Sequence, residues 1–326
     1  MLNLAEKRRR FTLFNYSLDG KGVLKDQHEE RNFKFFFKLL GRNMSRMLSI
    51  NMLILFSNFP IFFLLLGASQ NLNTTSYSPI SQYFGPLYGS IKMGGLNSPL
   101  TSAVMGVHGL QTEISVNTTA TYVMYALGAL VIFTFGLSMV GTTYITRNII
   151  KGEPIFLMHD FFYAIKRNWK QGLIFGILDV LFSFLIVYDI LFFMANATSF
   201  ATSAMFWASV FIGIIYFVMR FYIYVMMITF DLSLYKLIKN AFIFSAVGIK
   251  RNILGLLGIV ALIFINYSML LVFIPIGIIL PFMLTLAIGQ FIGIYTSWPK
   301  IYSIMIEPYE EEKEEPTEEP IFKDRG

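Results

Sequence analysis

Long runs of apolar residues alternate with short polar segments along most of this chain. Six runs reach the length of about 20 residues that a helix needs to cross the hydrocarbon core of a bilayer. They contain very few charged residues, as transmembrane helices do. The predicted spans are 47–67, 121–144, 172–194, 204–229, 253–273 and 276–297. The pattern therefore predicts an all-α polytopic membrane protein with six transmembrane helices in a bundle.

The composition points to the same fold class. Of the 326 residues, 55% are hydrophobic and 14% are charged, whereas soluble domains carry about 25% charged residues. The chain has no cysteine, which excludes disulfides, thiolate nucleophiles and cysteine metal sites. We expect a membrane protein that carries no cofactor.

Lysine and arginine are distributed very unevenly between the two ends of the spans. With the N-terminus inside, all 26 of them except Lys92 and Arg220 fall on the inner side. Cytoplasmic loops are enriched in these residues, so the asymmetry predicts that both termini are cytoplasmic. The predicted regions are a basic N-terminal region at 1–46, a membrane domain at 47–297 with an outer loop at 68–120, and an acidic disordered tail at 298–326.

Each span that starts inside follows an amphipathic segment, and a basic corner with an asparagine marks the junction. The corners are Gly41-Arg42-Asn43, Lys166-Arg167-Asn168 and Lys250-Arg251-Asn252. Helices of this kind lie on the membrane surface while their cations reach the headgroups. We therefore predict three cytoplasmic interfacial helices whose cations form a surface for anionic inner-leaflet lipid or a protein partner. This candidate surface consists of Arg31, Lys34, Lys38, Arg42, Lys166, Arg167, Lys170, Lys236, Lys239, Lys250 and Arg251.

The recurrence of these corners has two interpretations. Three diverged copies of one unit, each with an interfacial helix and two spans, would produce it. The general preference for cations at inner helix ends would produce much of the same pattern, and we favour that explanation.

Three charged residues lie within the predicted spans, where charge is costly and marks function or pairing. Asp189 is near the outer boundary of its span, whereas Asp179 and Arg220 lie deeper. Asp179 lies about 10 Å from the inner end of its span, and Arg220 lies about 13 Å from the same end of the next. Because the two spans are antiparallel neighbours, we expect an ion pair. A structural pair is favoured over a proton or substrate relay, since a single pair does not form a relay chain.

Three uncharged polar residues complete the candidate intramembrane site, namely Asn58, Asn266 and Gln290. Asn58 precedes Pro60 by two residues, which predicts a kink or a break in the first span. Polar residues in spans bind helices to one another more often than they touch a substrate.

Patterns typical of enzymes are absent from the sequence. The three histidines are scattered, and there is no His-Glu-x-x-His, Gly-x-Ser-x-Gly or Walker motif. Intramembrane proteolysis by an aspartate pair would need a second buried aspartate beside Asp179. We predict that the protein is not an enzyme, has no catalytic, cofactor or metal site, and binds no nucleic acid.

The two largest segments outside the spans each have two interpretations. The outer loop at 68–120 either folds back as a lid of short helices and turns, which we favour, or binds a ligand or a partner. The acidic tail is either a solvated disordered segment, which we favour, or a docking segment for a basic partner.

Three stretches of the sequence together resemble the YesL family of Gram-positive bacterial membrane proteins, a family defined by a domain of unknown function. The first runs from Phe14-Asn15-Tyr16 through Gly20-Lys21-Gly22-Val23 and Phe35-Phe36-Phe37 to Asn58-Phe59-Pro60. The second joins Arg147 to the segment from Asp160 to Gln171, and the third joins Phe230-Asp231-Leu232-Ser233-Leu234 to Lys239-Asn240-Ala241. The resemblance covers most of residues 11–297.

The resemblance implies a location in the bacterial plasma membrane and assigns no activity to any residue. It also implies an association with carbohydrate ABC transporters and two-component sensors. Our first hypothesis is therefore a non-enzymatic accessory or scaffold protein linked to carbohydrate uptake or its sensing. The alternative is a small-solute secondary transporter that uses the polar residues of the spans.

Overall fold

The computed structural model of the chain describes residues 33–79 and 111–309, and these form two compact units divided after Arg42. In the first unit, α1 (Phe33–Arg42) is the helix expected before the first span, and Lys34, Lys38 and Arg42 are exposed on it. Arg31, most of the outer loop and nearly all of the acidic tail lie outside the described residues.

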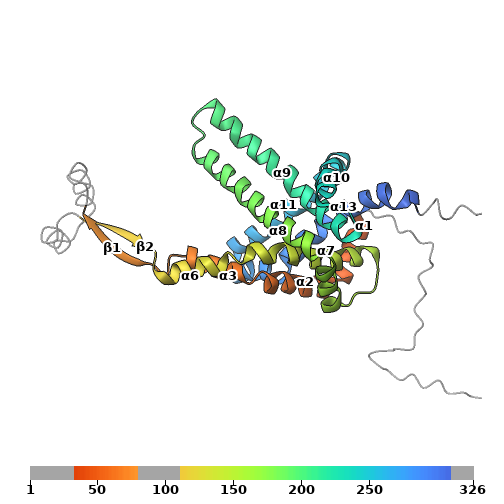
Figure 1. Cartoon of the computed structure of the whole chain (residues 1–326), viewed down its shortest axis with the longest axis horizontal. Coiled ribbons are helices and arrows are strands. Elements are labelled where there is room, and N and C mark those ends of the chain that lie inside the picture. The colour runs from red at the N-terminus through yellow and green to blue at the C-terminus, as the bar shows by residue number, and fades with distance from the viewer. Residues whose placement is uncertain (1–32, 80–110, 310–326) are drawn as a thin grey trace, which may run out of the picture. The chain divides into compact units, whose positions relative to one another are not determined.

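Helices long and apolar enough to cross a membrane make up most of the second unit (Figure 1). Five pass by length and composition, and a bent helix pair makes a sixth if it is one span. The expected all-α polytopic fold class is confirmed. The helices are the bent pair α2 (Met44–Ser57) and α3 (Pro60–Ala68), then α6 (Thr119–Gly128) with α7 (Val131–Lys151), α8 (Leu157–Ala195), α9 (Phe200–Thr229), α11 (Ile249–Val272), and α12 (Ile274–Leu280) with α13 (Leu286–Met305).

The bent helix pair has its break where the sequence predicts one. The axes of α2 and α3 differ by 65° across Asn58 and Phe59, and Pro60 opens α3. Proline is favoured at the first turn of a helix because its missing N–H would be unpaired there anyway. The side-chain amide of Asn58 donates to the Ile54 carbonyl at 2.9 Å, alongside the backbone N–H of Asn58, at the end of α2.

The longest helix, α8, combines a predicted interfacial helix with a predicted span. Its 39 residues would extend about 58 Å if straight, about twice the thickness of the hydrocarbon core. The helix changes direction at Asn168, whose φ and ψ are −115° and 19°. The Asn168 amide donates to the Ala164 carbonyl at 3.0 Å, which stabilises the kink.

A similar backbone conformation recurs at the first basic corner but not within the third. Asn43, which precedes α2, has φ −111° and ψ 18°. Gly248, between α10 (Leu234–Val247) and α11, has φ −86° and ψ 10°. Asn252, the asparagine of the third corner, lies inside α11, so the break there falls four residues earlier and only two of the three corners share a local geometry. We call the end of the helices where α7 and α9 stop and α11 begins the basic end.

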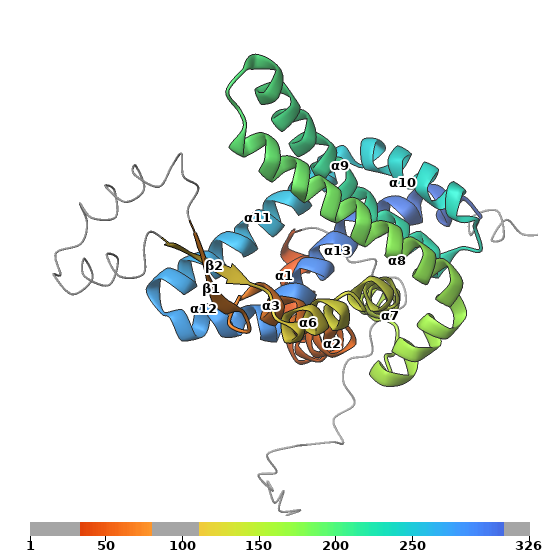
Figure 2. The ribbon, with the colours of Figure 1, turned by 60° about the vertical axis from the view of Figure 1, so that its left-hand side comes forward.

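Helices α7 and α8 approach each other so closely that only glycine fits at their crossing. A Cβ atom on Gly136 would lie 2.2 Å from the carbonyl oxygen of Gly172 and 2.3 Å from the Cα of Gly176. Beyond this crossing, α8 and α9 continue as an antiparallel hairpin that extends past the other helices of the unit (Figure 2). Most large side chains on its distal half are exposed, as expected of a surface that faces lipid.

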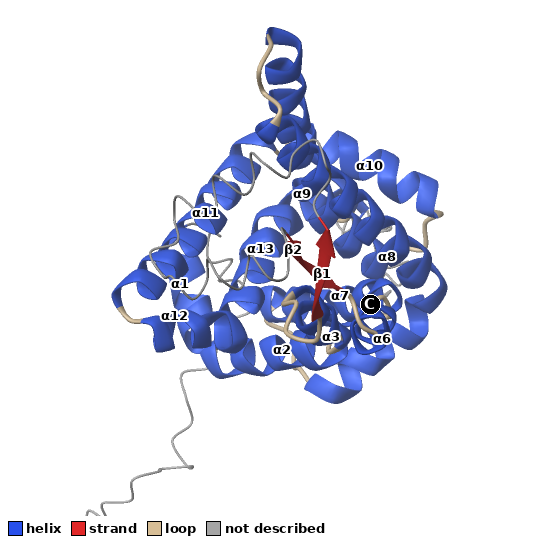
Figure 3. Cartoon of the chain, turned by 90° about the vertical axis from the view of Figure 1, so that its left-hand side faces the viewer, coloured by secondary structure: helices blue, strands red, loops and turns tan. Residues whose placement is uncertain are grey.

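The outer loop begins and ends in a two-stranded antiparallel ribbon, visible in red in Figure 3. Strand β1 (Thr74–Pro79) pairs with β2 (Gln111–Val116), with Thr74 opposite Val116. The expected lid of short helices and turns is therefore wrong for the described ends of the loop. Thr118 caps α6 and also donates to the Leu72 carbonyl at 2.7 Å, which ties the base of the ribbon to the helix.

A π-helical turn, η1 (Pro281–Thr285), joins α12 to α13. Asn51, fully buried on α2, compensates for this irregular backbone. Its amide nitrogen donates to the carbonyls of Pro281 and Phe282 at 3.1 and 2.7 Å, and its oxygen accepts from the Ala287 N–H at 3.0 Å. One side chain thus satisfies three backbone groups that would be costly to leave unpaired in an apolar setting.

Candidate functional site

A buried acid with three partners lies between α8 and α9. Asp179 is fully buried, and the Nε of Arg220 lies 2.7 Å from its Oδ1 atom. The hydroxyl of Tyr216 donates to Oδ1, and that of Tyr224 donates to Oδ2, both at 2.8 Å. The structure thus brings together the two charges whose depths match in the sequence, and it adds two tyrosines.

Helical spacing explains why these groups meet. Tyr216, Arg220 and Tyr224 are four residues apart on α9 and therefore share one face. Asp179 is three residues after Gly176, which lies at the close crossing with α7. The ring of Phe135 on α7 covers the guanidinium, whose carbon is 5.4 Å from the ring centroid. The cluster therefore connects three helices.

The geometry of the cluster favours a structural pair. Both carboxylate oxygens accept a hydrogen bond, and the adjacent cation balances the negative charge. The Arg220 Nε–H is not aimed at an acceptor, so its contact with Asp179 is an ion pair rather than a directed hydrogen bond. The sequence offered one signal for the tyrosines, their four-residue spacing from Arg220, but tyrosine is too common in this chain for that spacing to stand out.

The other predicted polar residues each bind a different neighbour. The Thr134 hydroxyl lies 3.4 Å from the Asn58 amide oxygen, and the Thr285 hydroxyl donates to Asn266 at 2.9 Å. The amide nitrogen of Gln290 donates to the hydroxyls of Thr142 and Thr143 at 2.9 and 3.0 Å. They join α2 to α7, α11 to η1 and α13 to α7, as polar residues that bind helices together do.

Arg147 is a buried cation at the basic end, and the sequence pattern assigned it no separate role. Arg147 donates to the Ile228 carbonyl at 3.3 Å and to the Thr229 hydroxyl at 3.0 Å, at the last turn of α9. A cation is favourable there because the helix dipole places negative charge at that end. The rings of Tyr144 and Trp298 lie 4.9 and 5.9 Å from the guanidinium carbon. Arg147 thus joins α7, α9 and α13.

Most cations of the candidate surface that the structure describes are exposed to solvent. Lys166, Arg167 and Lys170 are exposed around the kink of α8. Lys236 and Lys239 on α10 and Lys250 on α11 are also exposed, and Arg251 is half-buried. These positions leave the cations accessible to lipid headgroups or to a partner.

Long apolar helices and polar side chains that pair between helices define the chain as an all-α polytopic membrane protein. Residues 116–190 match a protein family described as "Protein of unknown function, DUF624". The matched stretch includes Arg147 and Asp179 and ends before Arg220. It is compatible with the YesL resemblance, which stays a prediction. Neither a curated protein nor a solved structure matches the chain.

Proposed function

We propose that this chain is a non-enzymatic accessory or scaffold protein of the bacterial plasma membrane, linked to carbohydrate uptake or its sensing. Both termini are cytoplasmic in this proposal, so that the basic end faces the cytoplasm and the anionic inner leaflet. The link to carbohydrate rests on the YesL resemblance alone.

The contrast between the interior and the basic end carries the proposal. Inside the bundle, Asp179, Asn51 and Asn266 each bind a neighbouring helix, and such satisfied groups support a rigid scaffold. At the basic end, exposed cations gather at the kink of α8 and on α10. Clustered cations next to spans attract anionic lipids and acidic protein surfaces.

Neutralising the cations at the kink of α8 should release a protein partner. A variant with Lys166→Gln, Arg167→Gln and Lys170→Gln would lose up to three exposed ion pairs of about 0.2–1 kcal/mol each. We therefore expect a loss of about tenfold in the amount of partner recovered. The measurement is quantitative mass spectrometry of complexes purified from native membranes after cross-linking, scored for carbohydrate ABC transporter and two-component sensor subunits.

The matched control keeps all three charges, with Lys166→Arg, Arg167→Lys and Lys170→Arg, and should retain the partner. Recovery of the parent protein alone, with no subunit of either kind, would reject the accessory role.

A second candidate function is small-solute transport, and the position of Asp179 favours it. A fully buried carboxylate in a membrane segment is a functional-site hypothesis by default. A substrate hydroxyl or a proton carrier could take the place of the two tyrosine hydroxyls that donate to Asp179. We rank this function second because Arg220 balances the charge of Asp179 in the structure.

Under the transport hypothesis, Asp179→Asn should lower solute flux into liposomes by at least about tenfold, as expected when a charged hydrogen-bond partner is lost. Arg220→Gln should act in the same direction. Asp189→Asn, on the same helix, is the control and should leave flux unchanged. Under the accessory proposal the parent protein moves no solute, so flux in the parent that depends on Asp179 would favour the transporter.

A further inference from the structure

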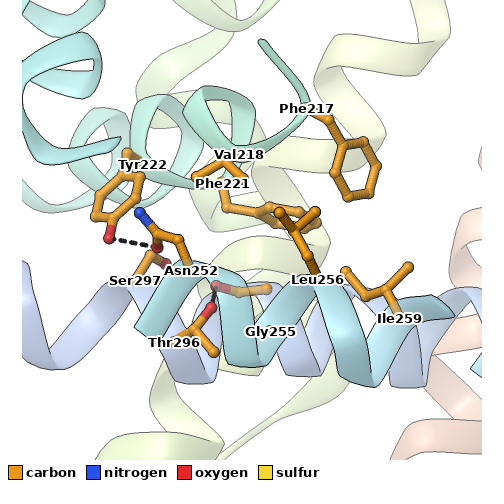
Figure 4. A pocket seen from close by; sticks show the side chains of 11 residues that line it. Phe217, Val218, Phe221, Tyr222, Asn252, Gly255, Leu256, Ile259, Thr296 and Ser297 are labelled. Atoms are coloured by element: carbon orange, nitrogen blue, oxygen red, sulfur yellow. Dashed lines mark hydrogen bonds between the residues drawn. The ribbon is translucent and has the colours of Figure 1, made fainter. Parts of the chain in front are cut away.

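The hollow between α9, α11 and α13 is too small to admit a ligand (Figure 4). Its walls include Phe217, Leu256 and Ile259, and the Tyr222 hydroxyl donates to Asn252 at 2.9 Å beside them. The free space has room for about one water molecule. An acidic ligand attracted to the basic end therefore does not enter the bundle at this point, and the cations that it can reach lie on the surface.

Five exposed cations gather where α8 and α10 meet, and we call this surface the α8–α10 face. The Gln171 amide donates to the Leu232 carbonyl at 2.8 Å, which ties the two segments together. Gln171 directly follows a lysine at the kink of α8, and Leu232 lies four residues before the first lysine of α10. The face consists of Lys166, Arg167, Lys170, Lys236 and Lys239.

Among the residues that the structure describes, no carboxylate pairs with these five cations. The ion pairs found there involve other residues. Asp231 is exposed just before α10 and forms an ion pair with none of the five. The α8–α10 face therefore carries a concentrated positive charge that a flexible acidic ligand could neutralise.

An acidic stretch of the same chain follows α13. Residues 310–319 contain seven glutamates and one lysine, and we call them the acidic segment. Helix α13 leads the chain to the basic end, since the Trp298 ring lies 5.8 Å from the Lys151 Nζ atom at the last residue of α7. Met305 is seven residues, or about 10 Å, farther along α13. The chain therefore enters the acidic segment at the end of the unit that carries the α8–α10 face.

A short path of contacts connects α13 with this face. The Trp298 ring lies 5.9 Å from the guanidinium carbon of Arg147, which donates to the Thr229 hydroxyl at 3.0 Å. Three residues after Thr229, Leu232 accepts the bond from Gln171. Ten residues of extended chain reach at most about 36 Å, which exceeds the length of about 21 Å expected for α10. The acidic segment is thus long enough to reach the face from the end of α13.

We propose that the acidic segment binds the α8–α10 face of its own chain and competes there with acidic ligands from outside. Single exposed ion pairs contribute little, but seven glutamates facing five cations form several at once. The covalent link also gives the segment a high effective concentration at the face. The competition rests on the proposed accessory function, because it assumes a partner at this face, whereas the binding of the segment does not.

Disulfide formation between two introduced cysteines tests this contact, and the chain has no natural cysteine that would interfere. Tyr235→Cys, at a position 75% exposed beside Lys236, is combined with Thr317→Cys in the full chain. The rate of the intramolecular disulfide in uncharged detergent reports the effective concentration of one thiol at the other. Replacing all seven glutamates of the segment with glutamine should slow the reaction about tenfold. Equal rates with and without the glutamates would overturn the proposal.

Neutralising the face tests the same contact from the other side. Lys236→Gln with Lys239→Gln should slow the disulfide about fivefold, whereas Lys236→Arg with Lys239→Arg keeps the charges and should retain most of the rate. Salt at 1 M, where the screening length falls to about 3 Å from about 10 Å at 0.1 M, should slow the parent as well. A rate insensitive to salt, or equal rates in the two lysine variants, would contradict the proposal.

The purified chain contains no partner, so this experiment separates the contact from the accessory role. A slow disulfide in the parent would reject the contact even if a partner is recovered from native membranes. A fast disulfide that depends on the glutamates would support the contact even if no partner is recovered.

Discussion

Replacing Asp179 with leucine should destabilise the protein by about 3–5 kcal/mol, the usual cost of removing one partner of a buried ion pair. The substitution leaves the Arg220 guanidinium without its counter-charge and the hydroxyls of Tyr216 and Tyr224 without their acceptor. The measurement is reversible unfolding in mixed micelles, followed by circular dichroism.

Two further variants separate the ion pair from other effects of the substitution. Asp189→Leu makes the same change elsewhere on α8 and should have little effect. The double variant Asp179→Leu with Arg220→Leu removes both charges and should recover much of the lost stability, because an apolar pair can replace a buried ion pair. An Asp179→Leu protein as stable as the parent would show that the pair does not hold the hairpin together, and would favour a functional role for the acid.

Replacing Gly136 with alanine should force α7 and α8 apart. The added methyl group would meet the backbone of Gly172 and Gly176 at 2.2 and 2.3 Å, and backbone atoms cannot move aside as a flexible side chain can. Overpacking of this kind costs about 1–3 kcal/mol, and more where the neighbours are rigid. We expect a loss of about 3 kcal/mol in the same unfolding assay, together with a lower yield of folded protein.

Gly289→Ala is the matched control for this substitution. The nearest atom to a Cβ on Gly289 is Leu262 Cδ2 at 3.8 Å, an ordinary contact. Alanine should be neutral there, or stabilising by about 0.5–1 kcal/mol, since glycine is the weaker helix former. Equal stability of Gly136→Ala and Gly289→Ala would mean that α7 and α8 separate without cost at their crossing.

The spans and the Asp179 pair were accessible from the sequence because both depend on simple periodicity and length. Hydropathy locates the membrane helices, and the helical rise places Asp179 and Arg220 at matching depths. Asn58 and Pro60 likewise predict the break between α2 and α3, since proline interrupts helical hydrogen bonding.

The missed features depend on backbone geometry or on contacts between distant residues. Asn51 is one polar residue in an apolar run, and its role depends on a π-helical turn 230 residues later that no local pattern indicates. The strands β1 and β2 lie in a polar loop of mostly small residues, where strand pairing is set by contacts across the ladder. Arg147 resembles any inner-end cation until its contact with the last turn of α9 is seen.

The bond between Asn51 and η1 has a consequence for the order in which the protein is made. A chain synthesised from its N-terminus delivers α2 to the membrane long before Pro281, Phe282 and Ala287 exist. Until then, the Asn51 amide must remain hydrated or form hydrogen bonds with another group, because an unpaired amide in hydrocarbon is costly. The membrane segment that contains α2 is therefore completed only when η1 and α13 have been inserted.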